Sequence, residues 1–83
     1  MDLTIIRPTG TETRSVVWVD IDTDDVGNFV IKREHAPMVL AIAEHKPITV
    51  LLTSGKQETF AVKHGGFAHI EREKVTLILH DQF

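Results

Sequence analysis

The stretch that decides the fold runs from Gly27 to Pro37 and reads Gly-Asn-Phe-Val-Ile-Lys-Arg-Glu-His-Ala-Pro. The three consecutive apolar residues at 29–31 can be buried, whereas the charged residues at 32–34 need water or charged partners. The chain must therefore pass from the core to the surface within this stretch. Pro37 has no amide hydrogen and favours extended geometry in the residue before it, so we expect a corner at 35–37 that presents side chains to a partner.

Length and composition predict one small globular domain over residues 1–83. Hydrophobic residues make up 42% of the chain and charged residues 25%, which argues against disorder. No apolar run approaches the roughly 18 residues that span a bilayer, and no secretory leader precedes the strand-like residues 3–6. The formal charge of −3 offers no basic surface for phosphate groups, so we expect no nucleic-acid partner. The lack of cysteine excludes disulfides, thiolate zinc sites and thiol catalysis.

Short β-branched runs separated by turn residues predict strands along most of the chain. In the second run, alternation places Val17, Val19 and Ile21 on one face and Val16 and Trp18 on the other. Residues 38–44 have a helix-like composition but are too few for a helix between two prolines, so we expect them to be extended. The pattern predicts an all-β fold, an antiparallel sandwich or barrel. The strands are expected at residues 3–6, 15–22, 29–31, 38–44, 48–53, 58–63, 67–70 and 75–79.

The residue types give no pattern typical of an enzyme. Five histidines suggest a metal site, but they lie in separate segments without ligand spacing, so exposed or hydrogen-bonded histidines are the simpler interpretation. Ser54 lies in a hairpin turn without a nucleophile motif, and Asp24 and Asp25 are turn residues first. We therefore expect no catalytic residue, no cofactor, no metal and no small-molecule substrate. The histidines are His35, His45, His64, His69 and His80.

Apolar residues on both faces of the second run predict leftover apolar surface. In a free-standing sandwich one face of each sheet is normally solvated, yet Val16 and Trp18 lie opposite an apolar face. A protein interface would cover such a surface. Sheet curvature or a covering loop would explain it nearly as well.

Two spaced motifs resemble a known family. The first is Gly27-Asn28-Phe29-Val30-Ile31 followed by His35-Ala36-Pro37, and the second is Gly65-Gly66-Phe67 followed by Lys74-Val75-Thr76-Leu77. Together they resemble the N-terminal domain of the epsilon subunit of F-type ATP synthases. That family reads Gly-x-Leu/Phe-x-Ile-Leu-Pro-x-His-Ala-Pro and, further along, Gly-Gly-Phe-x-x-Val-x-x-x-x-Val-Thr-Val. The resemblance covers nearly the whole chain, including the opening Leu-Thr-Ile-Ile.

The resemblance implies a flattened antiparallel β-sandwich of about ten short strands. It also implies a non-catalytic rotor subunit of the central stalk, which binds the gamma subunit through one sheet and the c-ring through the stretch 27–37, and couples ion-driven rotation to ATP synthesis. The expected location is the cytoplasmic face of the bacterial inner membrane, peripheral to it through the complex. The residues implied to contact the ring and gamma are Asn28, Lys32, Arg33, Glu34 and His35. The implied structural turn residues are Gly27, Pro37, Gly65 and Gly66.

The sequence departs from the family pattern in three places. Lys32-Arg33-Glu34 replaces Leu-Pro-Gly before His-Ala-Pro, and Asn28 replaces an acidic residue, so the ring contacts are altered. The turn Lys-Pro-Gly becomes Lys46-Pro47-Ile48. The family's C-terminal two-helix segment, associated with inhibition of ATP hydrolysis, has no counterpart in the sequence.

Two other functions stay open. A free-standing β-sandwich adaptor with unrelated partners would be indifferent to gamma. A small metalloenzyme would need several of the five histidines to converge on one metal ion.

Overall fold

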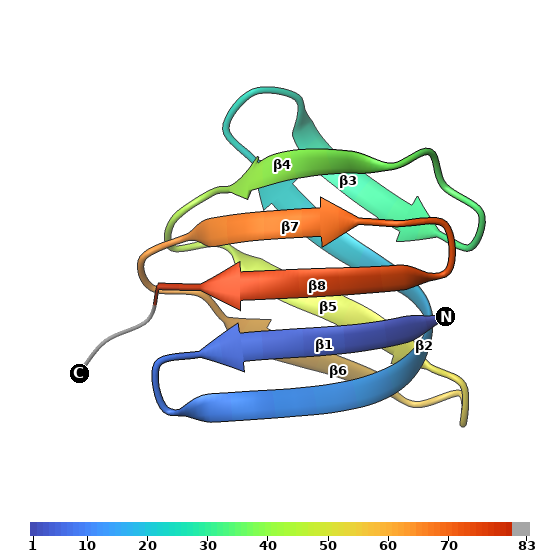
Figure 1. Ribbon diagram of the computed structural model, residues 1–83. Coiled ribbons are helices and arrows are strands. Elements are labelled where there is room, and N and C mark those ends of the chain that lie inside the picture. Colours follow the sequence, from blue (N-terminus) through green and yellow to red (C-terminus); the bar gives the residue numbers. More distant parts are fainter. Residues whose placement is uncertain (81–83) are drawn as a thin grey trace.

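The computed structural model describes residues 1–80, and every regular element in that part of the chain is a strand. The all-β class is therefore confirmed, and the ambiguous residues 38–44 contain a strand, as expected. Figure 1 shows the strands in two layers. The bounds are β1 Asp2–Arg7, β2 Gly10–Thr23, β3 Gly27–Lys32, β4 Met38–Ile42, β5 Pro47–Leu52, β6 Gln57–Ala61, β7 Gly66–Ile70 and β8 Lys74–Leu79.

Strand β2 joins the two layers of the sandwich. Its first half pairs with β1, and its second half pairs with β3 on one side and β5 on the other. The front layer in Figure 1 has the order β1-β8-β7-β4, and the back layer contains β3, β2, β5 and β6. At its far end β2 also pairs with β4, Thr23 opposite Ile42. One hydrogen-bonded path thus runs through both layers.

The strand count and direction differ from the expected ten antiparallel strands. The described residues form eight strands, and the 14-residue β2 serves both layers. Strands β1 and β8 are parallel, with Leu3 opposite Val75 and Ile5 opposite Leu77. Parallel neighbours need a long connection, and here the other six strands lie between them in sequence. The sheet is therefore mixed, although every other pair is antiparallel.

A β-bulge in β2 overturns the predicted facing of its valines. Val16 pairs with Leu52 and Trp18 with the adjacent Leu51, so Val17 is an extra residue without a partner on β5. An extra residue shifts the alternation by one position. Val16 is consequently buried, whereas Val17 is 47% exposed. Beyond the bulge, Val19 is buried as expected.

The predicted burial of all three residues at 29–31 is also wrong. Ile31 is fully buried, Phe29 is half-buried and Val30 is 39% exposed. Strand β3 pairs only with β2 among the described strands and lies over the core with one face. Alternation along such an edge strand points Val30 outward.

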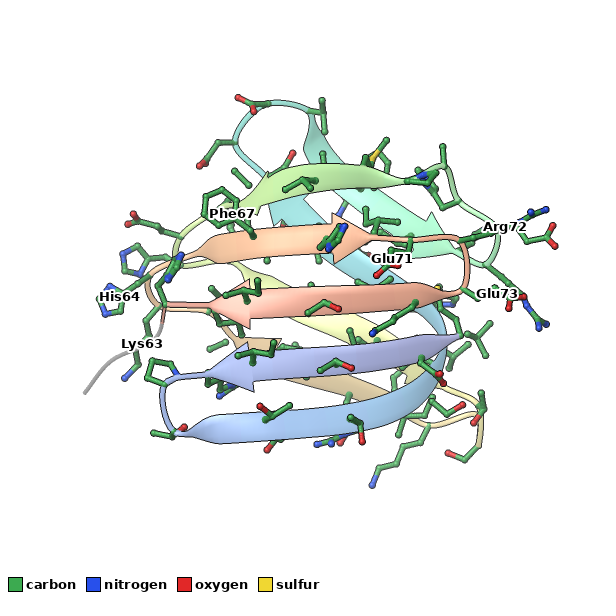
Figure 2. The ribbon with its side chains drawn as sticks, viewed as in Figure 1. Lys63, His64, Phe67, Glu71, Arg72 and Glu73 are labelled. Carbon is green, nitrogen blue, oxygen red and sulfur yellow. The ribbon has the colours of Figure 1, made fainter. Side chains whose placement is uncertain are left out.

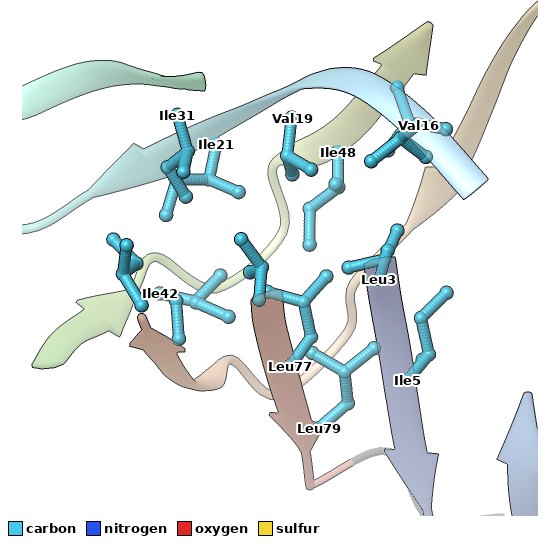
Figure 3. Packing of buried hydrophobic residues seen from close by; sticks show 14 of the residues in the cluster. Leu3, Ile5, Val16, Val19, Ile21, Ile31, Ile42, Ile48, Leu77 and Leu79 are labelled. Carbon is cyan, nitrogen blue, oxygen red and sulfur yellow. The ribbon is translucent and has the colours of Figure 1, made fainter. Parts of the chain in front are cut away.

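The core lies between the two layers and consists almost entirely of aliphatic side chains (Figure 3). Each strand contributes by alternation, so the inner faces of both layers interdigitate. Burial of such side chains supplies about 25 cal/mol per Å² of apolar surface, the main favourable term for folding. The core residues are Leu3, Ile5, Val16, Val19, Ile21, Ile31, Ile42, Ile48, Val50, Val62, Ala68, Ile70, Val75, Leu77 and Leu79.

Candidate partner-binding surfaces

The connection between β3 and β4 is held against the turn between β7 and β8. The amide of Glu34 donates a hydrogen bond to the carbonyl oxygen of Arg72 at 2.7 Å. The guanidinium of Arg33 pairs with the carboxylate of Glu73 at 3.3 Å. Both side chains of this ion pair are more than half exposed, so the pair adds little stability. The backbone hydrogen bond joins the connection to the turn, and the ion pair lies beside it.

Glu34 has a conformation that suits glycine. Its φ of 63° lies in the left-handed region, which costs a residue with a Cβ roughly 1–2 kcal/mol. The family that the motifs resemble has glycine at this position, whereas glutamate here adopts the same left-handed turn at a cost in strain. The side chain of Glu34 is exposed, as are those of Lys32 and Arg33. The predicted contact residues 32–34 thus lie on the surface together.

The side chain of His35 packs against β3 at the corner. Its ring meets the ring of Phe29 edge to face, with centroids 5.1 Å apart, and its Nδ1 lies 3.1 Å from the carbonyl oxygen of Ala36. Pro37 follows directly, and β4 begins at Met38. The corner predicted at 35–37 is present, in the connection between β3 and β4.

Asn28 lies at the other end of β3 from the corner. Its amide nitrogen donates to the carboxylates of Asp20 at 2.5 Å and Asp22 at 3.3 Å, both on the neighbouring β2. This amide therefore holds together two like charges on the outer face of the back layer. Asn28 is separated from Lys32 by about 13 Å of extended strand, so the structure does not bring it to the other predicted contact residues.

The predicted turn glycines have distinct geometries. Gly27 follows the turn at 24–26 with a φ of 75°, and Gly65 has a φ of 73°. A Cβ on Gly65 would lie 2.7 Å from the carbonyl oxygen of Ile42. A Cβ on Gly66 would overlap the carbonyl oxygen of Ile78, so only glycine allows β7 to start this close to β8.

An apolar row crosses the outer face of the front layer. Register places Ala41 opposite Phe67, Phe67 opposite Ile78, and Ile78 opposite Ile6. Phe67 is 48% exposed, and Ile78 and Ile6 are exposed as well. Figure 2 views this face directly, with Phe67 labelled at the start of β7. Because large exposed apolar patches often mark protein interfaces, this row is a candidate partner-binding surface.

The apolar row consists of Ile6, Ala41, Phe67 and Ile78. The sequence motif includes Phe67, but sequence reasoning predicted none of these four residues as a contact. Alternation within each strand could place one of these residues outward. Only the register between four strands, which the sequence does not specify, puts them side by side.

The outer face of the back layer is more polar. Asp20 lies between Val30 on β3 and Thr49 on β5, and Thr49 faces Thr59 on β6 with the two hydroxyls 3.2 Å apart. Trp18 is half-buried beside Lys32. The leftover apolar surface expected around Trp18 therefore lies mainly on the other layer.

The histidines form no metal-binding arrangement within the described residues. No group of three or more histidine, aspartate or glutamate side chains in residues 1–80 is arranged to hold a metal ion. His35 lies against Phe29, and His80 lies against Phe67 with ring centroids 5.9 Å apart.

Residues 1–80 also contain no helix that is long and apolar enough to cross a membrane.

Comparison with solved structures finds the same fold in ATP synthases. The chain aligns with a chain of the Euglena gracilis mitochondrial ATP synthase OSCP/F1/c-ring structure at a TM-score of 0.82 and 24% identity, covering 95% of this chain and 49% of that one. It aligns with a chain of the Tetrahymena thermophila mitochondrial ATP synthase central stalk/c-ring structure at a TM-score of 0.80 and 14% identity, covering 100% of this chain and 65% of that one.

The chain thus spans about half to two thirds of the length of these structural neighbours. No family profile matches the sequence, and no curated protein matches it in sequence. The chain therefore shares its fold with part of a chain in each of two mitochondrial ATP synthase assemblies.

Proposed function

We propose that this chain is a non-catalytic rotor subunit of an F-type ATP synthase, bound in the central stalk between the gamma subunit and the c-ring. Its task is mechanical, to couple ion-driven rotation of the ring to ATP synthesis through contact alone. The proposal rests on one combination. The fold is that of chains in ATP synthase stalk and ring assemblies. In this fold the two motifs that resemble the epsilon subunit lie side by side.

The meeting of the two motifs supports the proposal. Strand β4 follows His-Ala-Pro, and it pairs with β7, which begins at the Gly-Gly-Phe motif, with Ile42 opposite Gly66. At the other end of the same strands, the connection at 33–37 bonds to the β7–β8 turn through Glu34 and Arg72. Segments far apart in sequence thus form one continuous structural unit.

The apolar row on the front layer is the surface that we assign to gamma. It combines an exposed aromatic ring, Phe67, with two exposed isoleucines. Aromatic and aliphatic side chains of this kind are enriched at the centre of protein interfaces. The back layer instead exposes Asp20, Asp22 and Asn28, which suits a solvated or polar contact.

The stretch Gly27–Pro37 is the segment that we assign to the c-ring. Lys32, Arg33 and Glu34 are exposed, and the polar loops expected on a ring suit charged contacts. Membrane association then comes only through the complex. Both structural neighbours are mitochondrial, so the comparisons give no support to the bacterial inner membrane that the sequence had suggested.

A pull-down with the cognate gamma subunit tests the proposal. We expect the chain to be retained at micromolar concentration, and we expect Phe67→Asp to abolish retention, because a carboxylate would be buried against an apolar partner. Val26→Asp is the matched control, since Val26 is 59% exposed in the β2–β3 turn and does not belong to the apolar row. Absence of retention for the unmodified chain would overturn the proposal and favour the free-standing adaptor.

A further inference from the structure

The turn between β7 and β8 carries charges that the proposed function has not used. Its residues 71–73 and Lys74, the first residue of β8, are all exposed and follow Ile70 at the end of β7. From sequence they are only a hairpin turn. In the structure they lie at the same end of the sandwich as the connection at 33–37, and Figure 2 shows Arg72 and Glu73 there.

Three backbone hydrogen bonds hold this turn, one within it and one to each neighbouring segment. Within it, the amide of Glu71 donates to the carbonyl oxygen of Lys74 at 2.8 Å. On one flank, the amide of Asp2 donates to the carbonyl oxygen of Glu73 at 3.1 Å. On the other flank, Arg72 accepts the bond from Glu34 at 2.7 Å. A preorganised segment loses little conformational entropy on binding, which favours its use as a contact.

The charges at this end differ from those of the chain as a whole. Residues 32–34 and 71–74 contribute four cations and three carboxylates, a net charge of +1 in a chain of formal charge −3. The cation Arg33 is neutralised by Glu73. Within residues 1–80, Lys32, Arg72 and Lys74 form no ion pair, and all three residues are exposed.

We propose that the β7–β8 turn is a second segment of the ring-facing surface, with Arg72 as its principal contact. The partner group that it fits is a carboxylate on a polar loop of the c-ring, because the planar guanidinium binds a carboxylate through two parallel hydrogen bonds. This inference rests on the proposed function. It adds a contact residue next to Glu34 that the family resemblance does not name.

The test measures binding of the chain to purified gamma and, separately, to a detergent-solubilised complex of gamma with the c-ring. Arg72→Glu should weaken binding to the ring-containing complex by about tenfold and lower its salt dependence, because an attractive pair becomes repulsive. Binding to gamma alone should not change. Changing the facing ring carboxylate to lysine should restore the binding of Arg72→Glu.

Lys46→Glu is the matched control, since it makes the same charge change at an exposed site at the opposite end of the strands, between β4 and β5. Both variants lie in exposed connections, and equal thermal midpoints will confirm that each is folded. Equal binding of Arg72→Glu and Lys46→Glu to the ring-containing complex would overturn the inference while leaving gamma binding intact. Failure of the unmodified chain to bind gamma would overturn the proposed function and the inference with it.

Discussion

The imidazole of His35 meets the phenyl ring of Phe29 edge to face, with centroids 5.1 Å apart and ring planes inclined by 66°. This contact ties the corner before β4 to the strand that precedes it. Phe29 also packs against the core, so the corner is anchored through one ring to the interior. The exposed residues 32–34, which lie between the two rings in sequence, are therefore followed directly by an anchored residue.

Removing the His35 ring should loosen this corner. We expect His35→Ala to lower the free energy of unfolding by about 0.5–1.5 kcal/mol, the usual contribution of an aromatic pair. His35→Phe keeps an aromatic ring and should retain most of the stability. Urea denaturation of both variants measures the difference, and equal losses for alanine and phenylalanine would show that the ring contact does not contribute.

Glu34→Gly should stabilise the protein. Glycine removes the cost of the left-handed conformation at φ 63° and adds only the smaller cost of its own flexibility, so we expect a gain of about 0.5–1 kcal/mol. Glu34→Ala keeps the strained Cβ and should give no gain. Thermal and urea unfolding will distinguish the two, and a stabilising alanine would point to the charge of Glu34 as the source of strain.

Gly66→Ala should be strongly destabilising. Its methyl group would overlap the carbonyl oxygen of Ile78, and this oxygen cannot move without disturbing the β7–β8 pairing, so we expect a loss of about 3 kcal/mol or more. Gly55→Ala is the control, because no heavy atom lies within 4 Å of its Cβ position and only its φ of 92° is unfavourable. Chemical unfolding should show the larger loss for Gly66→Ala.

The bulge in β2 predicts opposite effects for two adjacent valines. Val16→Asp would bury a charge in the core and should cost more than about 3 kcal/mol or prevent folding. Val17→Asp should cost less than about 1 kcal/mol, since its side chain is 47% exposed. Circular dichroism with thermal melting measures both. If Val16→Asp folded and Val17→Asp did not, Val17 would be the buried residue. This result would contradict the bulge and support simple alternation.

Much of the fold could be predicted from the sequence, because each strand is a local run of β-branched and apolar residues. The corner before β4 could be predicted from Pro37, which excludes a continued strand. Alternation alone could not reveal the bulge at Val17, since one extra residue leaves the local composition unchanged. The parallel pairing of β1 with β8 is a contact between the two ends of the chain, and no local pattern specifies it.

The candidate surfaces also include residues that a local motif predicts and residues that only the three-dimensional structure brings together. Lys32 to His35 lie in one segment and could be named from their motif. The apolar row around Phe67 requires the register of four strands, and Arg72 requires the hydrogen bond that joins its turn to Glu34. Asn28 was placed with the corner by the same motif, yet strand β3 separates the two.

Cross-linking in an assembled ATP synthase tests the account most directly. The chain has no cysteine, so a single introduced thiol is unique in it. We expect Phe67→Cys, carrying a short thiol-reactive photocrosslinker, to form a covalent product with gamma, and Val26→Cys to form none. Absence of the chain from the purified complex, or equal cross-linking from the two positions, would contradict the assignment of this β-sandwich to the rotor.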